Sequence, residues 1–82
     1  MKSYCVLLSS IADVKNFVKA ACVQPFDIDV VSGRYIIDAK SILGLFSLDL
    51  TKPIRVEVHG TEQDAAGFYE EIRDFVQDEG DN

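Results

Sequence analysis

The chain has few of the residues on which disulfide frameworks and metal sites depend. Its 82 residues include two cysteines, one histidine, two prolines and no tryptophan. The two cysteines, Cys5 and Cys22, do not make a disulfide framework, and with a single histidine they match no zinc-ligand spacing. We therefore expect buried, free thiols, as in a reducing compartment, with no metal and no cofactor.

Long apolar runs are also missing. No stretch approaches the roughly 20 apolar residues of a membrane span. The segment Met1–Cys5 lacks the apolar region and small-residue cleavage site of a signal peptide. The expected location is the cytoplasm. The length predicts a single domain over residues 1–82, with one modest core.

Positive charge is scarce. Lysine and arginine number 8 against 14 aspartates and glutamates, and the net charge is −6. From Thr61 onward there are eight acidic residues and one basic residue. This distribution argues against nucleic acid and anionic membranes as partners. No enzyme motif and no small-molecule substrate site is evident, so we expect a non-catalytic protein.

The first half of the chain predicts a strand, a helix and a hairpin. Residues 2–8 are rich in strand-forming types. Apolar residues then recur at helical spacing from Ile11 to Ala21, with Ser10 and Asp13 as a capping box before them. Residues 27–31 and 34–38 predict two strands joined by the turn Ser32–Gly33.

The second half predicts a short helix, a strand and a closing helix. Residues 54–60 alternate between apolar and polar side chains, as in a half-buried strand. Thr61 and Asp64 form a second capping-box pattern, and the apolar face of the helix behind it extends to Val76. Residues 78–82 are expected to fray. The order β-α-β-β-α-β-α predicts an α+β fold with helices on one side of an antiparallel sheet.

The most informative segment surrounds Ser41. This serine precedes an apolar run that a glycine interrupts, Ile42-Leu-Gly-Leu-Phe46, and its side chain can cap a short helix. The amino end of a helix favours negative charge, so a phosphate on Ser41 would be accommodated there. A purely structural cap would leave the same pattern, and both interpretations stay open.

The stretch Lys40-Ser-Ile-Leu-Gly-Leu-Phe-Ser-Leu48 resembles the regulatory-serine segment of HPr, the small phosphocarrier of the bacterial sugar phosphotransferase system. The similarity in pattern extends over nearly the whole chain. It implies an HPr-like open-faced β-sandwich, with a four-stranded antiparallel sheet carrying two long helices and one short helix on one face.

One difference from that family concerns its phosphate-accepting histidine, which begins the first helix and is followed closely by an arginine and a proline. The corresponding residues here are Ser9-Ser-Ile-Ala-Asp-Val-Lys15. The histidine position falls on Ala12 and the arginine position near Val14. A methyl group cannot accept a phosphoryl group, so we predict no catalytic residue and the loss of ordinary phosphotransfer.

Three functional hypotheses follow. In the first, the chain is a regulatory HPr homologue that a serine kinase switches at Ser41 and that a transcription regulator or metabolic enzyme reads. In the second, it is a constitutive interaction module that binds through Ile42, Leu43 and Phe46, of which one or two should be exposed. In the third, it remains a phosphocarrier with a non-standard acceptor, such as His59 or Asp13.

Overall fold

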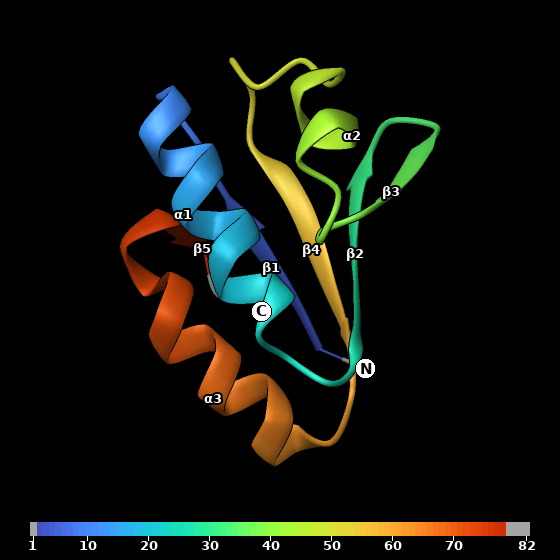
Figure 1. Ribbon diagram of the computed structural model, residues 1–82, viewed down its shortest axis with the longest axis vertical. Helices are drawn as coiled ribbons and strands as arrows, with labels where there is room; N and C mark the ends of the chain where they lie inside the picture. The colour runs from blue at the N-terminus through green and yellow to red at the C-terminus, as the bar shows by residue number, and fades with distance from the viewer. Residues whose placement is uncertain (1, 79–82) are drawn as a thin grey trace.

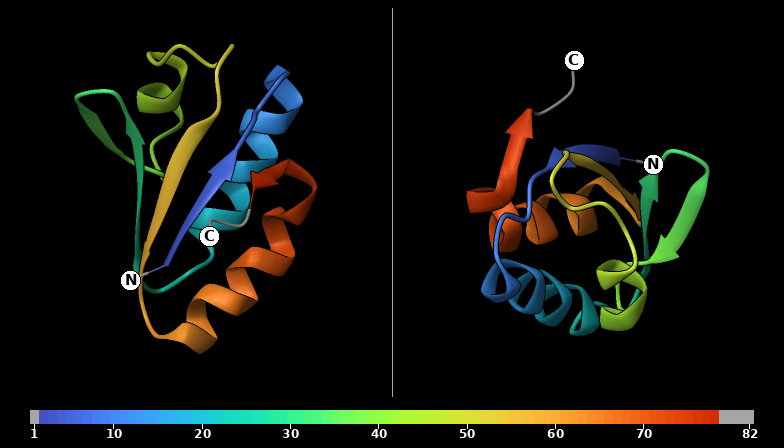
Figure 2. Two further views of the ribbon diagram at one scale, coloured as in Figure 1. Left: turned by 180° about the vertical axis from the view of Figure 1, so that it is seen from behind. Right: turned by 90° about the horizontal axis from the view of Figure 1, so that it is seen from above.

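A single antiparallel sheet and the helices on one of its faces make up the computed structural model, which describes residues 2–78 (Figures 1 and 2). The sheet has five strands in the order β3-β2-β4-β1-β5. Their bounds are β1 Lys2–Val6, β2 Asp27–Ser32, β3 Tyr35–Asp38, β4 Ile54–His59 and β5 Val76–Asp78. The helices are α1 Ile11–Cys22, α2 Ile42–Phe46 and α3 Glu62–Ile72, followed by a 3₁₀ turn, η1, at Arg73–Phe75. The predicted α+β class is confirmed.

The fifth strand corrects the prediction of a four-stranded sheet. The closing helix was expected to continue to Val76, but α3 ends at Ile72 and the chain turns to pair β5 with β1. The backbone N–H of Leu7 also donates to the carbonyl of Phe75 at 2.9 Å. Without β5, the N–H and C=O groups along this edge of β1 would lack strand partners. The chain was expected to fray from Asp78 onward, but Asp78 is the last residue of β5 and pairs with Cys5. The rest of that segment, residues 79–82, lies outside the described range.

The core lies between the sheet and the helices. Alternation along β2 and β4 turns Ile28, Val30, Val56 and Val58 inward, and all four are fully buried. Phe17 of α1 and Phe68 of α3 meet edge to face, with ring centroids 6.1 Å apart. This contact joins the two long helices above the sheet.

The two predicted capping boxes have different outcomes. At α3 the box is complete: Thr61 Oγ1 accepts from the Asp64 N–H, and the Asp64 carboxylate accepts from the Thr61 N–H. At α1 Ser10 caps the helix, accepting from the Asp13 N–H at 3.1 Å, but the box is not reciprocal. The Asp13 carboxylate accepts from the N–H and hydroxyl of Ser9 instead.

The hairpin turn is one residue later than predicted. Ser32 pairs with Tyr35, so the two turn residues are Gly33 and Arg34. Gly33 has a φ of +59°. A positive φ at the first turn residue is typical of the primed turns that match the twist of a hairpin, and glycine adopts it without strain.

Both cysteines are free, as predicted, but neither is fully buried. Cys5 is half-buried on β1 and Cys22, the last residue of α1, is exposed. Among residues 2–78, no helix is long and apolar enough to cross a membrane.

Candidate functional site

Ser41 stands between β3 and α2 and caps the short helix, as predicted. Its hydroxyl oxygen accepts from the Gly44 N–H at 3.1 Å, and its carbonyl accepts from the Leu45 N–H at 3.1 Å. Its own N–H donates to the carbonyl of Asp38 at 2.9 Å. Three hydrogen bonds therefore fix the backbone and side chain of this half-buried serine at the first turn of α2.

The glycine inside α2 has a packing role. A Cβ placed on Gly44 would lie 2.6 Å from Cγ2 of Ile37 on β3 and 3.0 Å from Oγ of Ser41. Any larger residue would force Ile37 or the capping serine to move. Glycine thus lets α2 approach β3 closely enough for Ser41 to form its cap.

Lys40, next to Ser41, forms hydrogen bonds within the fold through both its side chain and its backbone. Its ammonium group donates to the Gln24 carbonyl at 2.9 Å, just beyond the end of α1. Its backbone N–H donates to the Asp38 carboxylate at 2.9 Å. The lysine therefore joins the α1 end to the Ser41 segment, and a phosphate on Ser41 would have to compete for it.

The three apolar residues predicted to bind a partner differ in exposure. Leu43 is 81% exposed and Phe46 is 44% exposed, whereas Ile42 is half-buried and packs against the core. Leu45 is fully buried and anchors α2. This follows from the helical period, since Leu43 and Phe46 are three residues apart on one face and Ile42 and Leu45 share another. The expectation that one or two would be exposed is confirmed.

A shallow apolar groove separates the start of α1 from α2 and the segment after it. We call it the α1–α2 groove; it is lined by Leu8, Ser9, Ser10, Ile11, Val14, Phe46, Leu50 and Thr51. Ile11 begins the apolar series of α1 but is 64% exposed, and the buried part of the helix begins at Val14. Phe46 and Ile11 thus present apolar surface along the same groove.

A charged group lies beside this groove in the segment between α2 and β4. Hydrogen bonds from the hydroxyl and the N–H of Thr51 hold the pKa of Asp49 below its usual value. The carboxylate is therefore ionised at neutral pH. An apolar partner segment in the groove would meet a negative charge near Thr51.

The start of α1 carries no imidazole. Ala12 is exposed in the first turn, Val14 is buried, and the Asp13 carboxylate is occupied by Ser9. The only histidine in the sequence, His59, ends β4. Val6, which leads toward α1, pairs with Ile54 at the other end of β4. His59 and the α1 start therefore lie toward opposite ends of the sheet (Figure 1).

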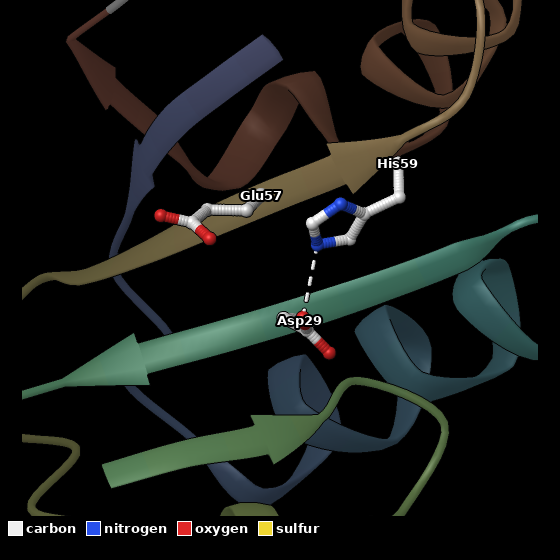
Figure 3. A group of neighbouring side chains, drawn as sticks. All are labelled: Asp29, Glu57 and His59. Carbon is white, nitrogen blue, oxygen red and sulfur yellow. Dashed lines mark hydrogen bonds and ion pairs between the residues drawn. The ribbon is translucent and has the colours of Figure 1, made fainter. Parts of the chain in front are cut away.

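His59 has neighbours that the sequence did not reveal. Its Nε2 lies 2.9 Å from Oδ2 of Asp29 on β2, and Glu57 stands beside it on β4 (Figure 3). Alternation along the strand predicts that Glu57 and His59 share a face. The pairing of β2 with β4 brings in Asp29, and no local signal in the sequence specifies that pairing.

Comparisons with known proteins point to one family. A family model described as the PTS HPr component phosphorylation site matches residues 13–78. Among solved structures, the chain is similar to the crystal structure of HPr-C-His from Thermoanaerobacter tengcongensis. The two are 21% identical with a TM-score of 0.75, and the similarity covers 90% of this chain and 89% of the other. No curated protein sequence matches the chain.

Proposed function

The chain belongs to the HPr family of the phosphotransferase system, and within that family we propose that it is a protein-binding regulator that does not carry phosphate on a histidine. The observation that carries the proposal is the composition of the α1 start. Ala12, the buried Val14 and the occupied Asp13 supply no free phosphoryl acceptor. The one cation of the segment, Lys15, follows the arginine position near Val14 by one residue. The same region retains an apolar surface.

That apolar surface is suited to binding a protein partner. Leu43 and Phe46 project from α2, and Ile11 stands across the α1–α2 groove from Phe46. Large apolar side chains gathered on one surface of a small domain are typical of a binding site. Leu45 and Gly44 hold α2 close to the rest of the fold, so the surface is presented by a fixed helix. Ile42 is half-buried, and it would contribute by packing α2 against the core.

Ser41 is the proposed control point. A phosphate would add about −1.5 to −2 units of charge at the first turn of α2, five residues before Phe46. The phosphate oxygens can accept the hydrogen bond from the Gly44 N–H that the hydroxyl oxygen accepts in the unmodified protein. Partners that offer cations next to an apolar pocket would then bind the phosphorylated form more tightly. In the family this role implies a serine kinase and, as reader, a transcription regulator or metabolic enzyme in the cytoplasm.

The first test is phosphorylation by the ATP-dependent serine kinase of the HPr family. We expect incorporation of label from radioactive ATP into the wild-type chain and its loss in Ser41→Ala. Ser47→Ala is the matched control, because Ser47 lies at the other end of α2 with its hydroxyl on the Gly44 carbonyl. Since Ser41→Ala also removes a cap worth about 1 kcal/mol, thermal melts must show that the variant is folded. Absence of label, or label that persists in Ser41→Ala, contradicts the switch.

The second test addresses the surface itself. A pull-down with the wild-type chain would capture the partner, and Phe46→Glu should weaken binding to it by at least about tenfold, since a central aromatic residue commonly contributes 2 kcal/mol or more. Tyr35→Glu on β3 is the control: Tyr35 is also exposed, at 67%, but does not line the groove. Binding that is equal with and without phosphate on Ser41, yet lost in Phe46→Glu, would favour a constitutive module. Equal effects of the two substitutions would argue against this surface.

A further inference from the structure

The outer face of the sheet, away from the helices, carries a row of carboxylates across three strands. Asp38 of β3 pairs with Asp29 of β2, and Asp29 pairs with Glu57 of β4. Two residues further along these strands, on the same outer face, Asp27 of β2 pairs with His59 of β4. Directly opposed like charges destabilise a sheet, so four acids in these two rows need compensation.

The compensation within the described residues is partial. Arg55 forms an ion pair with Glu57 at 2.9 Å, and His59 Nε2 lies 2.9 Å from Asp29. The Asp38 carboxylate accepts from the Lys40 N–H. The Glu57 and Asp29 side chains are only 16% and 34% exposed. A surface hollow beside Glu57 is lined by Asp27, Asp29, Asp38 and His59. Partly desolvated carboxylates around a hollow favour a cation in it.

We propose that Asp29, Glu57 and His59 form a binding site for a divalent transition-metal ion of the zinc type. A carboxylate oxygen of each acid and a ring nitrogen of His59 all lie within 4.8 Å of one another (Figure 3). Tetrahedral ligands at about 2.0–2.1 Å from Zn²⁺ are roughly 3.4 Å apart, so small side-chain rotations would close the site. Two carboxylates would neutralise the dipositive ion, with Glu57 exchanging its ion pair with Arg55 for the metal.

The ligand chemistry selects the class of metal. An imidazole nitrogen favours Zn²⁺, Ni²⁺ and Cu²⁺ over Mg²⁺ and Ca²⁺, which prefer oxygen ligands throughout. Three protein ligands leave a fourth position for water or for a ligand from a partner. The sequence has no cysteine-based zinc-ligand spacing. This site does not need one, because its ligands come from two paired strands. This proposal does not depend on phosphorylation of Ser41.

The test is calorimetric titration of the chain with ZnCl₂, in the presence and absence of excess MgCl₂. We expect one Zn²⁺ per chain, no displacement by Mg²⁺, and affinity at least tenfold lower in both His59→Ala and Asp29→Asn. NMR should show the His59 ring resonances shifting with Zn²⁺ in the wild type. His59→Ala shortens a side chain on the outer face and Asp29→Asn only removes its charge, so thermal melts should remain close to wild type.

Two control variants locate the ion. Glu71→Gln removes one negative charge from the exposed side of α3 and should change the affinity less than twofold. Cys22→Ser removes an exposed thiol that could itself bind zinc and should also have no effect. Failure of the wild type to bind Zn²⁺, unchanged affinity in both site variants, or loss of binding in Cys22→Ser overturns the proposal.

Discussion

Replacing Phe68 by alanine is expected to lower the free energy of unfolding by about 3–5 kcal/mol. Phe68 is fully buried on α3 and contacts Phe17 of α1 edge to face. Its removal would leave a cavity between the two long helices and take away an aromatic contact. Domains of this size are stable by only about 5–15 kcal/mol, so the loss is a large share of the total.

Urea unfolding followed by circular dichroism measures this change. Phe46→Ala is the matched control, because it deletes the same side chain from a site that is 44% exposed, and it should cost about 1 kcal/mol or less. Comparison of the two also shows whether the proposed binding surface can be altered without damage to the fold. A Phe68→Ala variant no less stable than Phe46→Ala would contradict the core assignment.

The second large effect is expected in phosphoryl transfer. Incubated with phosphoenolpyruvate and the first enzyme of the phosphotransferase system, this chain should take up no acid-labile phosphate, whereas a histidine-bearing HPr becomes labelled. The reason is chemical. Ala12 offers a methyl group, and the Asp13 carboxylate accepts two hydrogen bonds from Ser9. His59 lies toward the other end of the sheet from the α1 start (Figure 1).

A positive result would be equally informative. Acid-labile label on the wild-type chain would refute the proposed loss of phosphotransfer and support a phosphocarrier with a non-standard acceptor. His59→Ala and Asp13→Asn would then identify the labelled side chain. A control with Ser41→Ala separates this label from an acid-stable serine phosphate.

Much of the fold could be predicted because the signals are local. The alternation of residues 54–59, the Thr61–Asp64 box and the helical spacing in α1 each specify an element from neighbouring residues. The errors lie where distant parts of the chain compete with local preference. The apolar residues Phe75 and Val76 continue the helical pattern, yet they leave the helix because β1 has an edge to pair.

The features of the candidate site were likewise predicted only where they depend on neighbouring residues. Ser41 was recognised as a cap from the residues beside it, and the exposure of Leu43 and Phe46 follows from helical spacing. The α1–α2 groove was not predicted, because Ile11 and Phe46 come from helices far apart in the sequence. Nor were Asp29, Glu57 and His59 recognised as a group, since strand pairing brings them together.

The sequence by itself determined the α+β class, the family resemblance around Ser41, and the lack of a histidine at the start of the first helix. These depend on residue identity and short-range spacing. Only the tertiary structure decided that β5 completes the sheet, that Ile11 and Phe46 border one groove, and that His59 faces Asp29. Such contacts depend on strand register and helix packing, which the burial of the whole core fixes and which no local stretch encodes.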